Sequence, residues 1–192
     1  MLTRVYAVDA QTGKLLWKVR AGAHPRAKST GSATVYDGRI YVPMSSMETT
    51  TGATLTYECC TFRGHVTAID ASTGRKLWTS FVIQEEPKPR GKNKEGLTLW
   101  GPAGGSVWNP PTVDPKRHRL YVGTGNGVSD PAAAGTDSVI AMDMNTGKIV
   151  WQHQEYTNDQ FINNCRPQGE PGDNCPAALW PDYDFGGAAM IL

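Results

Sequence analysis

The sequence has no long apolar run and no excess of charge of one sign. No stretch of about 18 consecutive apolar residues occurs in it, so nothing in it predicts a membrane-spanning helix. It has 19 lysines and arginines against 18 aspartates and glutamates, so no broad positive field favours nucleic acid. The one basic cluster, residues 87–94, lacks the interleaved aromatic residues that stack on bases, and we expect it to be a solvated loop.

Cysteine is scarce, and its four copies form two local pairs. No CxxC or HxxxH spacing is present, so no zinc-binding pattern is available. Cys165 and Cys175 flank a loop rich in Pro, Gly and Asn, where a disulfide would contribute about 3 kcal/mol. The adjacent Cys59 and Cys60 are either two buried thiols or a small disulfide ring, and an oxidising compartment favours the ring.

Glycine and proline are frequent, at 21 and 13 residues, which indicates many turns and little helix. One pattern, Ala-x-Asp-x-x-Thr-Gly-Lys/Arg-x-x-Trp, occurs three times, within residues 5–17, 66–78 and 139–151. Each copy predicts a strand, a turn closed by the aspartate and Thr-Gly, and a return strand that ends in tryptophan.

Further strand pairs lie between these repeats, at 31–35 with 39–43 and at 111–113 with 119–123. Two hairpins per unit make a four-stranded sheet, and successive sheets of this kind make an all-β propeller. A solenoid is the competing repeat architecture, but its units are typically about 20–50 residues long, shorter than these. We therefore expect residues 1–192 to form one partial β-propeller domain of about three blades, a piece of a longer protein.

The repeat resembles the tryptophan-docking motif of the quinoprotein (PQQ-dependent) alcohol dehydrogenases, whose propellers have eight blades. The polyvinyl-alcohol dehydrogenase (cytochrome) branch is the most similar, through residues 59–64, 100–102, 174–176 and 181–186. The resemblance implies that the protein binds pyrroloquinoline quinone (PQQ) and Ca²⁺. It also implies that electrons from an alcohol, secondary or polymeric, pass to a cytochrome c.

The same resemblance assigns roles to residues between the repeats. Trp108 would form the floor under the quinone rings, and Asn126, eighteen residues later in Gly-Thr-Gly-Asn, would bind calcium. Glu48 is the second expected calcium ligand, with Glu58 as its rival. Asp184 would be the catalytic base and a further metal ligand. The residues expected to contact the cofactor are Thr30, Ser45, Cys59, Cys60, Arg63, Ser106 and Trp108.

Two other functions stay open at this point. A propeller with the same repeat can be a non-catalytic scaffold for binding or assembly, although a scaffold does not need the site residues. A calcium-dependent hydrolase could use Asp182 and Asp184 as paired carboxylates. The cysteines favour the periplasm or a secreted location, although no signal peptide precedes the first patterned strand of this sequence. The sequence also has no CxxCH heme-attachment motif.

Overall fold

Each repeat folds as a β-hairpin whose turn is closed by its aspartate. In the second copy, Asp70 Oδ1 accepts hydrogen bonds from the Thr73 amide at 2.9 Å and the Thr73 hydroxyl at 2.8 Å. Gly74 follows with φ +74°, a left-handed conformation that glycine adopts without steric cost. The three hairpins are β1 (Arg4–Val8) with β2 (Leu15–Arg20), β6 (His65–Asp70) with β7 (Lys76–Phe81), and β14 (Ser138–Asp143) with β15 (Ile149–Gln154).

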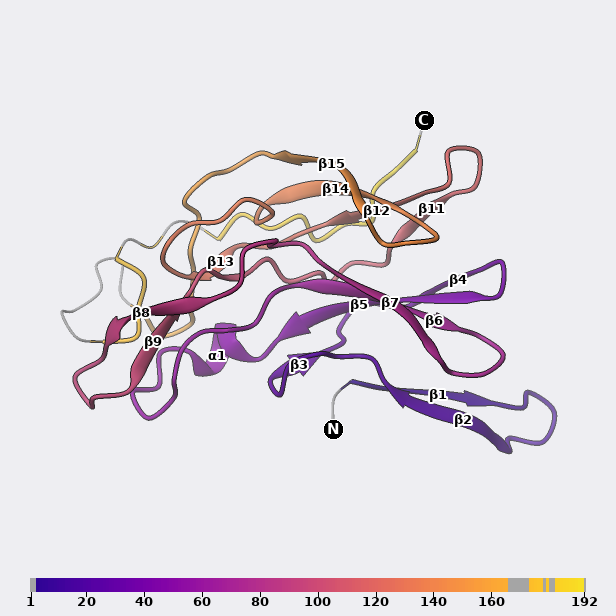
Figure 1. Ribbon diagram of the computed structural model, residues 1–192, viewed down its shortest axis with the longest axis horizontal. Coiled ribbons are helices and arrows are strands. Elements are labelled where there is room, and N and C mark those ends of the chain that lie inside the picture. Colours follow the sequence, from indigo (N-terminus) through magenta and orange to yellow (C-terminus); the bar gives the residue numbers. More distant parts are fainter. Residues whose placement is uncertain (1–2, 166–172, 178, 180–181, 192) are drawn as a thin grey trace.

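A second hairpin precedes the repeat hairpin in two of these units. It consists of β4 (Thr34–Tyr36) with β5 (Arg39–Ser46) in one unit and β11 (Thr112–Asp114) with β12 (Arg119–Gly123) in the other. One sheet has the order β11-β12-β14-β15, and the other joins β4, β5, β6 and β7, with β3 (Ala27–Lys28) on the end of β5. The computed structural model, which describes residues 3–165, 173–177, 179 and 182–191, is thus all-β, as predicted, with β1–β2 as a separate hairpin (Figure 1).

The remaining elements gather at one end of the molecule, away from most of the hairpin turns (Figure 1). They are α1 (Glu48–Thr51), the hairpin of β8 (Lys88–Lys92) and β9 (Thr98–Gly101), and the short pair β10 (Ala103–Gly104) and β13 (Gly127–Ser129). The prediction of a solvated loop at residues 87–94 was wrong, because most of this segment forms strand β8. Asn93 closes the turn by accepting hydrogen bonds from the amides of Glu95 and Leu97, which lets the two strands pair.

Tryptophans at the ends of two repeats join neighbouring units. Trp17 donates its indole N–H to the carbonyl of Ala71 at 2.9 Å, and its ring covers Gly74, where a Cβ would lie 2.7 Å from Cδ2. Trp78 repeats the contact one unit later, donating to the carbonyl of Met144 at 3.3 Å, with its ring over Gly147. These turns therefore need glycine for two reasons, its positive φ and the absence of a Cβ beneath the tryptophan ring.

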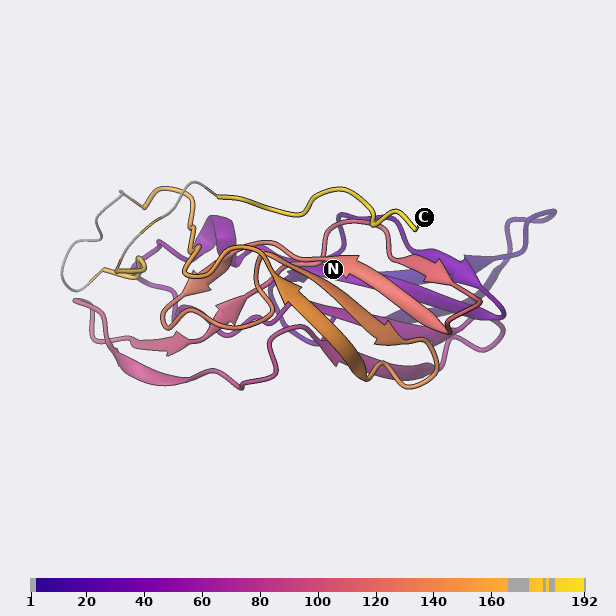
Figure 2. The same ribbon diagram turned by 90° about the horizontal axis from the view of Figure 1, so that it is seen from above.

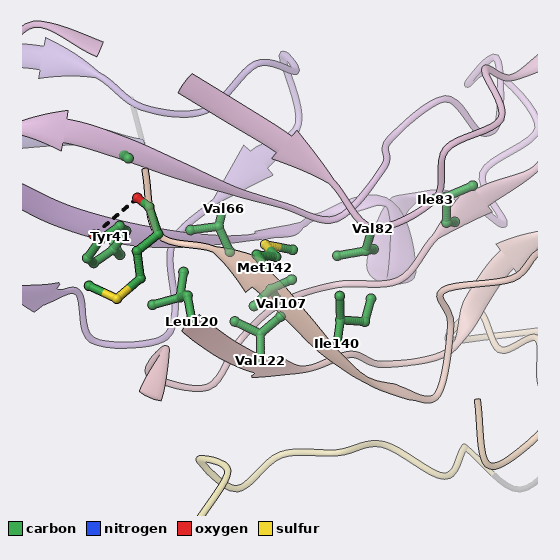
Figure 3. Packing of buried hydrophobic residues seen from close by; sticks show 11 residues of the cluster. Tyr41, Val66, Val82, Ile83, Val107, Leu120, Val122, Ile140 and Met142 are labelled. Carbon is green, nitrogen blue, oxygen red and sulfur yellow. Dashed lines mark hydrogen bonds between the residues drawn. The ribbon is translucent and has the colours of Figure 1, made fainter. Parts of the chain in front are cut away.

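The main core fills the space between the two large sheets (Figure 3). Each fully buried aliphatic side chain there contributes about 1.5–3 kcal/mol relative to leaving it exposed. The Tyr41 hydroxyl also donates a hydrogen bond to the Met144 carbonyl, so the phenol has a polar partner inside the core. The buried members include Tyr41, Val66, Val82, Val107, Leu120, Val122, Ile140 and Met142.

Both expected disulfides are present, Cys59–Cys60 and Cys165–Cys175. The first lies in a small core with Ala103, Val128 and Ile162, and Cys165 packs against that core. Residues 166–172 of the loop between Cys165 and Cys175 lie outside the described residues. The C-terminal residues run along one side of the sheets (Figure 2). Within the described part of the chain, no helix has the length and apolar character needed to cross a membrane.

Replacing Gly147 by alanine should test the docking contact. The new Cβ would lie 2.6 Å from Cε3 of Trp78, so we expect a loss of about 2–4 kcal/mol from the positive φ and the clash together. Gly38→Ala is the matched control, because Gly38 has φ +70° with nothing within 4 Å of its Cβ position. Urea denaturation should show a clearly smaller loss for the control, and equal losses would mean that the ring contact contributes nothing.

Candidate functional site

The polar residues before and after the β4–β5 hairpin lie close together because antiparallel strands return the chain to its starting end. Thr30 precedes β4 and Ser45 lies near the end of β5. Their hydroxyl oxygens are 3.0 Å apart and share a hydrogen bond. Ser45, which is buried, also donates to the Lys28 carbonyl, so these bonds hold the exposed Thr30 hydroxyl at the strand end.

The β11–β12 hairpin brings Trp108 and Asn126 together in the same way. Trp108 precedes β11 and Asn126 follows β12. Asn109 joins the two sides, since its Nδ2 donates to the Gly123 carbonyl at 2.9 Å and its Oδ1 accepts from the Gly123 amide at 3.3 Å. This side chain is 1 % exposed, so water does not compete for these bonds.

Backbone contacts bring the two hairpin ends side by side. The Val107 amide donates to the Met44 carbonyl at 3.1 Å, which joins the end of β5 to the segment before β11. Gly31 lies so close to the Trp108 carbonyl that a Cβ would be 2.6 Å from the oxygen. Ser45, near the end of β5, therefore faces the same space as Trp108 in the segment before β11.

The segment that carries Asp184 is attached to this arrangement from the C-terminal side. Asp184 Oδ1 accepts the Asn126 amide at 2.9 Å, and Asn109 donates to the Phe185 carbonyl at 2.7 Å. Two glycines make this approach possible. A Cβ on Gly125 would lie 2.3 Å from Asp184 Oδ1, and a Cβ on Gly186 would lie 2.2 Å from Cη2 of Trp108.

These residues border one cavity of about 410 Å³, which we call the first cavity. Of the expected site residues, it contains Thr30, Ser45, Ser106, Trp108, Asn126 and Asp184, together with Asp182. Trp108 is 37 % exposed, so part of its ring is open to the cavity. The other lining residues are Lys28, Ser46, Thr49, Thr50, Phe161 and Asn163.

The two aspartates at the cavity wall are electrostatically coupled. Loss of hydration by burial raises the pKa of Asp184, although part of the side chain remains exposed at the cavity. The hydrogen bond from the Asn126 amide stabilises the carboxylate anion and so partly offsets this rise. Burial together with the negative charges of Asp184 and Asp159 raises the pKa of Asp182 to about 6. Both groups are therefore stronger bases than an ordinary solvated carboxylate.

The structure does not bring Glu48 into the first cavity. Its carboxylate accepts hydrogen bonds from the Tyr57 hydroxyl at 2.6 Å and from the amides of Thr61 and Phe62, and the side chain is fully buried. Thr49 and Thr50, the next residues of α1, line the cavity instead, because successive helical residues point about 100° apart. Glu58 is exposed and also lies outside the cavity lining. The calcium role predicted for Glu48 stays a prediction.

The expected cofactor contacts Cys59, Cys60 and Arg63 also lie outside the first cavity. Backbone hydrogen bonds with Trp100 hold the cysteines beside β9, in the small core described above. Arg63 donates to the carbonyl of Ile83 at 3.3 Å and lies 4.2 Å from the centroid of the Phe81 ring. The described residues contain no group of three His, Cys, Asp or Glu side chains placed to hold a metal.

Two residues that support the site were missed by the sequence reasoning. Asn109 is one, and its position directly after Trp108 carries no signal of the bridge that it makes. Asp159 is the other, because its Oδ2 accepts the Tyr183 amide at 2.8 Å and so fixes the backbone between Asp182 and Asp184. No spacing in the sequence links Asp159 to residues more than twenty positions away, so only the folded chain reveals it.

Asp137 is a further buried carboxylate near the site. It is 0 % exposed, and neither carboxylate oxygen makes a hydrogen bond to the described residues. Burial, with the charges of Asp159 and Asp184 nearby, raises its pKa to about 8. Asp137 is therefore largely protonated near neutral pH.

Comparison with known proteins finds one matching family model, "Glucose/ethanol/alcohol dehydrogenase, beta-propeller domain", over residues 27–161. Polyvinylalcohol dehydrogenase of Sphingopyxis sp. (strain 113P3) is 44 % identical over 96 % of this chain and 28 % of its own length. This chain thus spans just over a quarter of that curated relative.

Two solved structures have a similar fold. The quinohemoprotein alcohol dehydrogenase ADHIIG of Pseudomonas putida HK5 gives a TM-score of 0.61 at 27 % identity, over 89 % of this chain and 28 % of that one. The quinohemoprotein alcohol dehydrogenase of Comamonas testosteroni gives 0.60 at 26 % identity, over 97 % of this chain and 27 % of that one.

Asp137 predicts a particular pH dependence of stability. Its pKa is about 8 in the folded state against an ordinary 3.8, so the folded state keeps a proton that the unfolded state loses between these values. The free energy of unfolding should therefore fall as pH rises across that window. Asp137→Asn should remove this fall and be more stable than the wild type by about 1–3 kcal/mol above the folded pKa.

Urea denaturation of both proteins across that pH window measures the difference. Asp37→Asn is the matched control, because Asp37 has the same φ of 45° but is exposed, and its profile should parallel the wild type. If the free energy of unfolding changes with pH in the same way in the wild type and in Asp137→Asn, the raised pKa of Asp137 is contradicted.

Proposed function

This chain belongs to the PQQ family of glucose, ethanol and alcohol dehydrogenase β-propellers, and we propose that the whole protein oxidises an alcohol with PQQ as its cofactor. The observation that carries the proposal is the first cavity, which joins an accessible indole, several hydroxyls and two carboxylates from four separate parts of the chain. Aromatic surface, hydrogen-bonding groups and a base are what a planar redox cofactor and an alcohol require.

The residues present fit a flat, carboxylate-bearing cofactor. Trp108 offers an aromatic surface, and Gly186 lets the chain pass against that ring without a side chain between them. Thr30, Ser45 and Ser106 offer hydroxyl donors, and Lys28 adds a cation. We propose that Trp108 stacks on the quinone rings while these polar groups hold the cofactor's carboxylates.

The donor set also fits a hard cation such as Ca²⁺, which prefers oxygen ligands. The described hydrogen bonds of the Asn126 side chain use Nδ2, to the carbonyls of Gly127 and Phe161, so Oδ1 is available as a ligand. Asp184 can supply a carboxylate oxygen beside it. We propose Asn126 and Asp184 as metal ligands, with Glu48 able to join only if it gives up its hydrogen bonds to Tyr57, Thr61 and Phe62.

Asp184 is the proposed catalytic base. When bound, PQQ would supply the two-electron acceptor for the alcohol, and a Ca²⁺ ion held by Asn126 and Asp184 would supply a Lewis acid. The chain's own contribution is the removal of the hydroxyl proton, because an alcohol becomes a good hydride donor only as that proton leaves. The Asn126 amide holds Oδ1 of Asp184, so Oδ2 is the oxygen that takes up the proton. Asp159 fixes the neighbouring backbone and with it the direction of the carboxylate.

We propose that the substrate is a secondary or polymeric alcohol and that a cytochrome c accepts the electrons. The Sphingopyxis relative's name supports a polymeric alcohol, and the quinohemoprotein relatives support a heme partner. The two disulfides support an oxidising location, the periplasm or outside the cell.

Asp184→Asn in the full-length protein, loaded with PQQ and Ca²⁺, tests this function. The variant keeps the shape of the side chain but removes the base, so turnover of a secondary alcohol with an artificial electron acceptor should fall by about 10²–10⁴. The fall should appear in kcat and kcat/KM together, because the base acts mainly in the transition state.

Asp182→Asn is the matched control and should lower turnover less. A larger effect at Asp182 would transfer the role of base to that residue. A wild-type protein that binds PQQ but oxidises no alcohol would contradict the proposed function and favour the scaffold alternative.

A further inference from the structure

One buried side chain, Asn174, holds the loop that follows α1. It is 0 % exposed, although it lies outside every helix and strand. Its Nδ2 group donates to three backbone carbonyls, those of Gly52 at 2.9 Å, Thr54 at 2.8 Å and Tyr57 at 2.9 Å. A single amide group therefore binds both ends of the irregular segment 52–57.

A second buried amide, that of Asn93, completes the arrangement. Its Nδ2 donates to Asn174 Oδ1 at 2.8 Å and to the Leu55 carbonyl, in the same loop, at 2.7 Å. Asn93 is 5 % exposed, so water competes little for these bonds. Both polar atoms of the Asn174 side chain are thus paired inside the protein, and a fully paired buried network favours one geometry.

The disulfide Cys165–Cys175 connects Asn174 to the wall of the first cavity. Cys175 follows Asn174 directly, and Cys165 lies two residues after Asn163, which lines the first cavity. The Asn163 amide donates to the Thr49 carbonyl in α1 at 2.8 Å. Asn163 therefore contacts α1 within the helix, while Asn174 contacts the residues directly after it.

α1 depends on such contacts because it is very short. It has four residues, no side chain caps its first turn, and an isolated helix of fewer than about 12 residues is marginal in water. Thr49 and Thr50 of α1 nevertheless line the first cavity. The position of this part of the cavity wall is therefore set by the groups that hold α1 from outside.

We propose that Asn174 is a positioning residue for the first cavity, which holds Thr49 and Thr50 in the cavity wall by binding the carbonyls of the loop after α1. Asn174 does not line the cavity itself, so it acts only through α1. The inference rests on the proposed function, because it takes the first cavity to be the PQQ site. Thr49 and Thr50 then add two hydroxyls to the groups that hold the cofactor's carboxylates.

Asn174→Ala in the full-length protein tests this role with two measurements that need no alcohol oxidation. In the PQQ-free protein, hydrogen exchange should become about ten-fold faster at the amides of Thr50, Thr51 and Gly52, which are bonded within α1. Titration with PQQ in the presence of Ca²⁺ should give a dissociation constant about ten-fold higher, the scale of losing one hydrogen bond. In the loaded enzyme kcat should be unchanged, because the bond between Asp184 and the Asn126 amide is kept.

Asn145→Ala is the matched control. The Asn145 side chain accepts a hydrogen bond from Arg39, more than 100 residues away, but it lines no part of the first cavity, so exchange in α1 and PQQ affinity should not change. If Asn174→Ala fails to fold, Asn174→Asp provides the comparison. It keeps the size of the side chain and the bond from Asn93 but has no N–H for the three carbonyls, so the same two effects are expected.

Unchanged exchange in α1 would overturn the inference, because Asn174 would then not hold the helix. Faster exchange with wild-type PQQ affinity would also overturn it, since α1 would then not affect the site. A loss of thermal stability without either effect would make Asn174 a packing residue. A wild-type protein that binds no PQQ would contradict the proposed function instead, and exchange in α1 would still decide whether Asn174 positions the cavity wall.

Discussion

Two tryptophan contacts set the spacing between the structural units, and the site depends on that spacing. Trp17 and Trp78 each donate an indole hydrogen bond to a turn of the next unit and cover its glycine. Because both contacts have the same geometry, neighbouring sheets are held in a repeated relationship. The segments at the strand ends have irregular backbone, and they supply most of the lining of the first cavity.

The strand pairs could be predicted well because their causes are local. Asp70, Thr73 and Gly74 form the same turn wherever the pattern occurs, and alternating apolar residues on each side pair as strands. The convergence of Thr30 with Ser45 follows from the same reasoning, because antiparallel strands return the chain to its starting end. The hairpin of β8 and β9 was missed because charged residues and proline in β8 conceal a pairing that Asn93 makes possible.

The site was predicted less completely, because its supporting bonds join distant residues. Asn109 and Asp159 make hydrogen bonds to the segment around Asp184, and neither has a motif that points to this role. Glu48 was expected at the metal because it follows a strand end, but the helical turn of α1 directs its carboxylate to the Tyr57 hydroxyl and backbone amides. Resemblance identifies residue types at matching positions, whereas the direction of each side chain depends on the local backbone.

The central claim is that the first cavity holds a quinone on the ring of Trp108. The most direct test is a titration of the PQQ-free full-length protein with PQQ, in the presence of Ca²⁺, followed by quinone absorbance. Trp108→Ala should weaken binding by about 3 kcal/mol, and Trp108→Phe should recover part of the loss. Trp100→Ala, which changes a tryptophan that lines a different cavity, should bind as the wild type does. Wild-type affinity in Trp108→Ala would contradict the claim and make Trp108 a packing residue.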